Sequence, residues 1–301
     1  MTPEAAHGTS PTVAEVTAVI EAMHPLEWAQ PWDAVGLVCG DPAAPVRKVL
    51  FAVDPVESVV DEALAFGADL LVTHHPLLLK PVNSVAGSTF KGRLVHRLIT
   101  AGCALYVAHT NADAGAPGVS DALARVLDLA DLVPLEPLAG SGRSDLGIGR
   151  VGDLAAPERL GDFADRVAQA LPETEQGVRI AGDLDALVRR VAVCGGSGDS
   201  LFDAVRASGA DVFVTADLRH HPASEARERA AFDGAAASAA GGATSTPHLV
   251  DVSHWASEWP WLAGCSDRLV AALSASGRTV VAHVSTTSTD PWTLRVPSRG
   301  E

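Results

Sequence analysis

The sequence predicts an α/β fold made of two related α/β lobes, and three observations lead to this prediction. Short apolar runs of strand length alternate with segments of helical periodicity, a pattern typical of strands covered on both faces. The order of these elements repeats in the second half of the chain. The chain has 301 residues, 47% of them hydrophobic, which is enough for two packed cores. We expect a first lobe over 1–130, a connecting segment of the same fold over 131–190, and a second lobe over 191–301.

In the first half, the predicted elements begin with a helix over 13–23. Thr12 is its expected N-cap, and Glu15 three residues later completes a capping box. The elements predicted after it are a strand over 48–53, a helix over 56–66, a strand over 69–73, a helix over 91–101 and a strand over 104–108.

The second half repeats this order without a gap in register. Gly209 lies 142 positions after Gly67, as Val191 does after Val49, and both glycines open a Gly-Ala-Asp segment. Such a match indicates internal duplication of one α/β unit. The elements predicted here are a strand over 191–194, a helix over 200–208, and strands over 212–215 and 249–252.

Three further segments are assigned by composition. The segment 146–169 is expected to form a strand over 148–151, a loop containing Pro157 and a helix. The segment 230–247 is rich in Ala, Gly, Ser and Thr and is predicted to be a flexible surface loop. The tail after Pro291 is expected to be partly disordered.

Composition excludes several classes of function. A formal charge of −15 disfavours a nucleic-acid-binding surface, which needs clustered basic residues. The four cysteines form no C-x-x-C pair, as expected for reduced thiols rather than a disulfide framework or a zinc ribbon. No signal peptide and no apolar run long enough to cross a membrane is recognisable. We therefore expect a soluble, cytoplasmic protein.

The first group of candidate site residues is His74-His75-Pro76, directly after a predicted strand. Neighbouring strand residues point to opposite faces, so both histidines can serve one site only where the strand ends. Pro76 favours such an exit because it cannot donate to a sheet ladder. The carboxyl ends of strands are where open α/β sheets bind ligands. The alternative is a pair of solvated histidines.

The second group is a motif that occurs twice, His109-x3-Asp113 and His254-x3-Glu258, each just after a predicted strand. In a helical turn this spacing puts both side chains on one face, where they can converge on a metal. Either copy alone is better explained as a structural histidine with a capping acid. Two copies at equivalent places, beside a His-His pair, favour a metal site.

The combined donors are imidazole and carboxylate without thiolate. This set suits Zn²⁺, Mn²⁺, Fe²⁺, Co²⁺ or Ni²⁺ and argues against a structural cysteine-rich zinc site. Five or six such donors exceed the need of one catalytic zinc, whereas two metals about 3.5–4 Å apart with a bridging carboxylate would use them. Glu258 is the natural bridge because its longer arm can present both oxygens.

Three other features allow two readings each. The Gly-rich turn 194–198 either cradles a phosphate on its amides or is a tight turn that needs positive φ. Asp217 and His220-His221 either line the same cavity or form an exposed turn. The tryptophans 255, 259 and 261 either wall a pocket or an oligomer contact, or pack in the core.

Taken together, these residues resemble the GTP cyclohydrolase 1 type 2 family, also called the NGG-interacting-factor-like dinuclear metal proteins. Two positions depart from the family pattern: Ala34 stands where Asn is usual and Ala216 where Gly is usual, and neither is a candidate ligand. The motifs that carry the resemblance follow in order over nearly the whole chain: Trp32-Asp33-Ala34-Val35-Gly36-Leu37, Thr73-His74-His75-Pro76-Leu77, His109-Thr110-Asn111-Ala112-Asp113, Cys194-Gly195-Gly196-Ser197-Gly198, Thr215-Ala216-Asp217-Leu218-Arg219-His220-His221 and His254-Trp255-Ala256-Ser257-Glu258.

The resemblance implies a dinuclear metal centre in the cleft between two lobes, and a toroidal homohexamer. It implies two divalent cations (Zn, Fe, Mn, Co or Ni). It assigns His74 and Asp113 to one ion, His75 and His254 to the other, and Glu258 to both.

The function that we expect is a metal-dependent hydrolase that opens the imidazole ring of GTP and releases formate. Glu258 is the expected catalytic ligand, and His109 or His221 could shuttle protons. The substrate would be a small molecule, GTP or another nucleotide. The alternatives are a non-enzymatic metal-binding adaptor or assembly protein, and a dinuclear hydrolase of another nucleotide or a phosphoester.

Overall fold

The computed structural model describes residues 9–239 and 245–297, which are arranged in two compact α/β units, each built on its own sheet. The first unit comprises residues up to 115 together with 262–289, and the second comprises 116–261 together with the residues from 290 on. These bounds differ from the three segments expected from the sequence. The whole of 131–190 lies in the second unit, and 262–289 returns to the first.

The sheet of the first unit has the strand order β1-β4-β3-β2-β11. Its central strands are parallel, and only the edge strand β1 runs antiparallel to its neighbour. Parallel strands bring their carboxyl ends to one edge, which is where a ligand site is expected. The strands are β1 (Gly36–Cys39), β2 (Lys48–Ala52), β3 (Leu70–Thr73), β4 (Ala104–Val107) and β11 (Val281–Val284).

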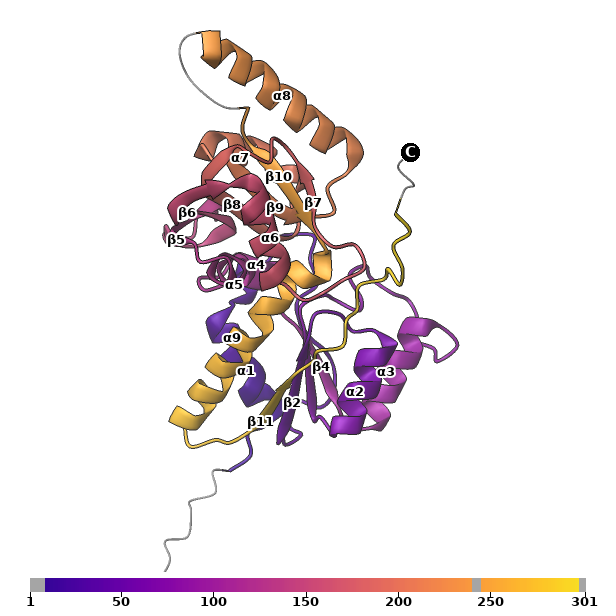
Figure 1. Cartoon of the computed structure of the whole chain (residues 1–301). Coiled ribbons are helices and arrows are strands. Elements are labelled where there is room, and N and C mark those ends of the chain that lie inside the picture. The colour runs from indigo at the N-terminus through magenta and orange to yellow at the C-terminus, as the bar shows by residue number, and fades with distance from the viewer. Residues whose placement is uncertain (1–8, 240–244, 298–301) are drawn as a thin grey trace, which may run out of the picture. The chain divides into compact units, whose positions relative to one another are not determined.

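Helices cover both faces of this sheet, which explains why its strands are continuous apolar runs. Helices α2 (Glu57–Phe66) and α3 (Phe90–Thr100) lie on one face, and α1 (Val13–Met23) lies on the other together with the later part of α9 (His254–Ala275) (Figure 1). Alternate strand residues such as Leu50 and Leu71 pack with α2 and α3 in one buried cluster. The expected capping box at the start of α1 is present, with Thr12 and Glu15 each bonding the other's backbone amide.

The sheet of the second unit has the order β5-β6-β8-β9-β10-β7. Strands β8, β9 and β10 are parallel, and the strands outside them are antiparallel. The parallel strands again bring their carboxyl ends to one edge. The strands are β5 (Ala130–Pro137), β6 (Gly147–Arg159), β7 (Arg179–Ala181), β8 (Leu187–Ser197), β9 (Val212–Ala216) and β10 (His248–Val252).

One face of this sheet packs against α7 (Phe202–Ser208) and the start of α8 (His220–Ala239), through a cluster that includes Phe202, Phe213 and Ala226. Helices α5 (Val119–Val126) and α6 (Leu160–Ala170) contact β6 and β8. None of the helices within 9–239 and 245–297 combines the length and apolar character that crossing a bilayer requires.

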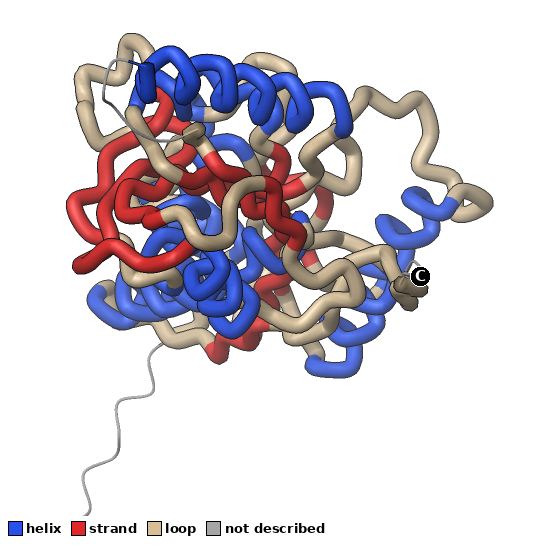
Figure 2. Tube along the Cα trace, turned by 45° about the horizontal axis from the view of Figure 1, so that its top comes forward, coloured by secondary structure: helices blue, strands red, loops and turns tan. Residues whose placement is uncertain are grey.

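Two expectations for the second unit are wrong. Pro157 lies in strand β6 rather than in a loop, at a register shift between Asp153 and Glu158, where a residue without an amide hydrogen is tolerated. Residues 230–239 belong to helix α8, the long helix at the top of the view in Figure 2, rather than to a loop. The alanines of this segment have the highest helix propensity of any residue and outweigh its single glycine. Residues 240–244 and 298–301 lie outside the described residues.

The repeated Gly-Ala-Asp segments have the same local structure in both units. Gly67 ends α2 and Gly209 ends α7 in the left-handed conformation, with φ of 74° and 70°. Each following aspartate accepts two backbone amides through one oxygen, which fixes the start of the neighbouring strands. These bonds run to Asp69 Oδ2 from Arg47 and Lys48 (2.7 and 3.0 Å) and to Asp211 Oδ2 from Arg189 and Arg190 (2.9 and 2.8 Å).

A basic side chain also closes the helix end at the equivalent position of each unit. Lys48 Nζ donates to the carbonyl of Phe66 (2.8 Å), and Arg190 Nε donates to the carbonyl of Ser208 (2.9 Å). A cation is favoured there because the last carbonyls of a helix lack partners within the helix. Descent of both units from one duplicated ancestor stays a prediction.

Stability of the first unit should depend on pH through His24, which is fully buried. Its Nε2 lies 2.7 Å from Arg268 Nη2, and burial with the nearby Arg268 lowers the pKa of His24 to about 3. The unfolded chain therefore binds more protons below pH about 6.5, so stability present above that pH is lost as the pH falls toward 3. Between pH 6.5 and 5 we expect a loss of about 2 kcal/mol, at about 1.4 kcal/mol per pH unit. Urea unfolding of wild type and His24→Gln at both pH values tests this, and parallel pH profiles would contradict it.

Candidate metal centre

In the first unit, His74 and His75 lie where strand β3 ends. Their amides still pair with β2, donating to the carbonyls of Ala52 (3.1 Å) and Val53 (2.8 Å). Thr73 Oγ1 bonds the carbonyl of His75 at 2.9 Å and fixes the exit of the chain. The two imidazole centroids are 5.0 Å apart. Both rings therefore lie close together at the end of the strand, as expected from the sequence.

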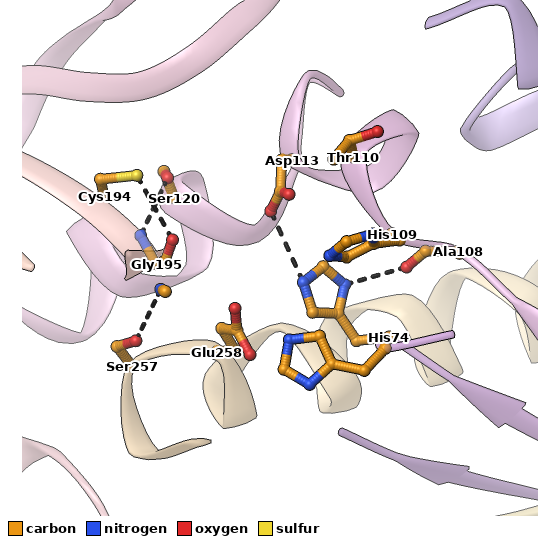
Figure 3. A network of polar contacts seen from close by, with 12 residues as sticks. His74, Ala108, His109, Thr110, Asp113, Ser120, Cys194, Gly195, Ser257 and Glu258 are labelled. Atoms are coloured by element: carbon orange, nitrogen blue, oxygen red, sulfur yellow. Dashed lines mark hydrogen bonds and ion pairs between the residues drawn. The ribbon is translucent and has the colours of Figure 1, made fainter. Parts of the chain in front are cut away.

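His109 and Asp113 join this pair from the end of the neighbouring strand β4. His109 precedes the short helix α4 (Thr110–Asp113), and its ring centroid is 5.2 Å from that of His74 and 5.5 Å from that of His75. One ring nitrogen from each of these three histidines lies within 4.8 Å of the other two. Asp113 Oδ1 is 3.7 Å from His74 Nε2 (Figure 3). The first unit thus brings together every site residue predicted within it, and His109 lies among the candidate ligands.

Each of these three imidazole rings is oriented by a hydrogen bond at its Nδ1 atom. An oxygen that accepts from Nδ1–H selects one tautomer and leaves Nε2 as a lone-pair donor, which is how metal-ligating histidines are usually oriented. The partners of His75 and His109 are carboxylates that the sequence interpretation did not assign. The pairs are His74 with the carbonyl of Ala108 (2.9 Å, Figure 3), His75 with Asp54 Oδ1 (2.7 Å) and His109 with Asp33 Oδ1 (2.8 Å).

Asp33, the carboxylate beside His109, is fixed by several hydrogen bonds. Its side chain is fully buried, and it accepts from the backbone amide and the hydroxyl of Thr110 as well as from His109. Burial would raise the pKa of Asp33, but hydrogen bonds from His109 and Thr110 outweigh it and hold the pKa well below its ordinary value. The carboxylate therefore stays ionised, and it fixes the ring of His109 while Trp32 lies at the edge of that ring.

In the second unit, His254 and Glu258 lie in the first turns of helix α9. Their i, i+4 spacing brings His254 Nε2 to 3.0 Å from Glu258 Oε1, as the sequence predicted for one helical face. His254 Nδ1 lies 2.7 Å from Asp217 Oδ2, so this ring is oriented like those of the first unit. Glu258 is only 3% exposed. A buried carboxylate against an imidazole Nε2 is a donor pair suited to a divalent metal.

The glycine-rich turn after β8 packs directly on this pair. The amide of Gly196 donates to Ser257 Oγ (2.8 Å), and that of Gly195 donates to Ser120 Oγ (3.3 Å, Figure 3). A Cβ on Gly196, whose φ is +70°, would lie 2.5 Å from Glu258 Oε1 and 3.1 Å from His254 Nε2. The positive φ of Gly196 fits the tight-turn alternative, and the amides of Gly195 and Gly196 are engaged by serine hydroxyls.

The other candidates have different outcomes. Asp217 contacts His254, whereas His220 and His221 are both exposed at the start of α8, with ring centroids 5.2 Å apart. A catalytic role of His221 stays a prediction. Trp255 and Trp261 are buried, as expected for core packing.

Comparison with known proteins identifies the family. The model of the Duf34/NIF3 family (NGG1p interacting factor 3) matches residues 11–291. The chain belongs to this family. A Streptomyces coelicolor relative of the family, named GTP cyclohydrolase 1 type 2 homolog, is 52% identical over 288 residues that span 96% of each chain. The resemblance found in the sequence is thereby confirmed.

Solved structures of similar proteins share the fold. A Bacillus cereus protein related to NIF3 is 25% identical, with a TM-score of 0.83 over 96% of this chain and 100% of that one. The Staphylococcus aureus protein SA1388 is 26% identical, with a TM-score of 0.80 over 94% and 99% of the two chains. Family membership and fold are therefore established over nearly the full length.

Replacing Asp217 by Asn should weaken metal binding without disturbing the backbone. Asn tolerates the left-handed conformation that Asp217 adopts (φ 55°), so the turn is retained while the charge behind His254 is lost. Loss of such a partner typically costs about 10–100-fold in metal affinity. Competition with a fluorescent chelator measures this affinity for wild type and variant. An affinity within twofold of wild type would show that Asp217 does not orient a ligand.

Proposed function

We propose that the two sets of donors serve one dinuclear centre in a cleft between two related lobes. In this proposal His74 and Asp113 would hold one divalent ion, His75 and His254 would hold the other, and Glu258 would contribute to both. The observation that carries the proposal is shared by four histidines: each has Nδ1 held by an oxygen, so that each presents Nε2. A solvated histidine does not need an oxygen that fixes its tautomer and ring orientation, whereas a metal-ligating histidine usually has one.

The reaction that we propose is metal-dependent hydrolysis of a nucleotide, with GTP as the substrate and formate as a product. The name of the Streptomyces coelicolor relative, GTP cyclohydrolase 1 type 2 homolog, supports this choice. When bound, a pair of divalent ions supplies Lewis acidity and lowers the pKa of water, which makes a nucleophile available at neutral pH. Zn, Fe, Mn, Co and Ni all suit donors of nitrogen and oxygen.

The chain's own residues would position the substrate and move the proton. His109 lies within 4.8 Å of the ligand nitrogens of its unit and is oriented by the ionised Asp33. An imidazole with Nδ1 fixed in this way can accept a proton at Nε2 and return it, because the carboxylate stabilises the imidazolium. The same placement would also suit a ligand, so His109→Gln should be assayed for both metal content and turnover.

The proposal is tested with protein purified without a chelating tag. Metal content is measured first, and the protein is then incubated with GTP, ATP and a generic phosphodiester while formate and phosphate are quantified. Release of formate from GTP that stops after chelation and returns with added metal supports the cyclohydrolase reaction. Turnover by the metal-free protein would contradict it. Phosphate release without formate would indicate a phosphoester hydrolase, and no turnover of any of them a non-enzymatic metal-binding adaptor.

The homohexamer implied by the family resemblance is also a proposal for this chain. Sedimentation velocity of the full chain tests it directly, since its 31.0 kDa mass separates a hexamer from a monomer or dimer.

A further inference from the structure

A cavity of about 610 Å³ lies within the second unit. Its size falls within the range of small-molecule sites. Three segments far apart in sequence form it: one from Glu175 to Arg179 at the start of β7, one at Asp217 and Leu218 after β9, and one from Trp292 to Arg295 near the end of the described chain. Asp217, which holds His254 Nδ1, is part of its wall.

On one side of this cavity, Arg179 is held by the buried carboxylate of Asp251. This carboxylate is 5% exposed and accepts from Arg179 Nε (2.8 Å), from Gln176 Nε2 (3.3 Å) and from the amide of Leu218 (3.0 Å). The guanidinium of Arg179 is thus fixed in place while 61% of the side chain remains exposed. A cation held in this way loses little side-chain entropy when it binds an anion.

The other side presents an aromatic ring and further charges. Trp292 lines the cavity and is 63% exposed, so its ring is accessible to a ligand. Arg295 and Glu175 also line the cavity and are exposed. The cavity therefore offers a stacking surface, guanidinium donors and a carboxylate acceptor at once.

We propose that this cavity recognises a purine nucleotide, with Trp292 stacking on the base, Glu175 accepting from the N–H donors of a guanine edge, and Arg295 with Arg179 binding phosphate. A carboxylate suits guanine rather than adenine, because the guanine edge carries two neighbouring N–H donors. This inference deepens the proposed function and rests on it, since it places recognition of the nucleotide at Asp217, which orients the proposed metal ligand His254. Trp292, Arg295 and Glu175 would be specificity-determining residues and not metal ligands.

The test measures the affinity of the metal-loaded full chain for GTP and ATP by isothermal titration calorimetry. For Trp292→Ala we expect GTP affinity about 5- to 150-fold weaker, the usual effect of removing a stacking ring, with Trp292→Phe restoring most of it. For Glu175→Gln we expect the preference for GTP over ATP to fall roughly tenfold. The matched control is Phe232→Ala, which removes another exposed aromatic (72% exposed) from the same unit and should leave affinity unchanged.

Metal content and thermal unfolding of each variant show whether its fold and its centre are intact. GTP affinity equal to wild type in a folded Trp292→Ala variant would overturn the inference even if wild type turns GTP over. The absence of GTP binding by wild type would overturn it as well. Conversely, tight GTP binding that depends on Trp292 but gives no formate would keep this site and contradict the proposed reaction.

Discussion

Glu258→Gln should lower metal content and abolish turnover together. Gln has nearly the same shape but no charge, and at a position only 3% exposed the lost carboxylate cannot be replaced by solvent. A neutral amide cannot bridge two cations, so we expect metal affinity to fall by more than about 100-fold, beyond the effect of losing an outer partner. Elemental analysis and formate release on the same preparation measure both quantities.

The matched control is Glu228→Gln, the same chemical change at an exposed position of α8. It should leave metal content and turnover at the wild-type level. A Glu258→Gln protein that keeps its metal and its formate release would remove Glu258 from the centre.

Gly196→Ala should be nearly as damaging, although it adds a single methyl group. The new Cβ would meet Glu258 Oε1 at 2.5 Å, closer than any normal contact, so the carboxylate must move. A displacement of about 1 Å at a reacting group can cost about 100-fold in rate. We expect turnover to fall by about that factor, and metal affinity to fall about tenfold or more.

A matched control separates this displacement from backbone strain. Gly209 has the same φ of +70°, but a Cβ there would have nothing within 4 Å. Gly209→Ala should therefore lose roughly 1 kcal/mol of stability, as any alanine at positive φ does, and keep its metal. Equal metal loss in both variants would show that strain and not contact with Glu258 is responsible.

Much of the fold follows from local patterns in the sequence. The helix at 13–23 is bounded by its capping box, and the buried strands of both sheets are apolar runs of the expected length. The His-His pair after β3 and the i, i+4 pair at the start of α9 have the predicted geometry, since each depends only on residues close in sequence. The repeated Gly-Ala-Asp segment also has one structure in both units for this reason.

What the sequence did not reveal depends on contacts between distant residues. Asp33 reaches His109 across 76 positions and Asp54 reaches His75 across 21, so neither pair is visible as a spacing. Asp54 nevertheless directly follows the strand predicted over 48–53, and a carboxylate at a strand end is a pattern that indicates a site residue. The return of 262–289 to the first unit is a property of the chain path and leaves no local pattern.

The central claim is that donors from both units hold one pair of metals, and the metal-to-protein ratio tests it most directly. Plasma mass spectrometry on untagged wild type, His74→Ala and His254→Ala compares one ligand from each unit. We predict about two divalent ions per chain in wild type. In both variants we expect the metal-to-protein ratio to fall clearly below that of wild type. A wild-type protein that binds no divalent metal even when titrated with excess metal, or a His254→Ala variant that keeps both ions, would contradict this account.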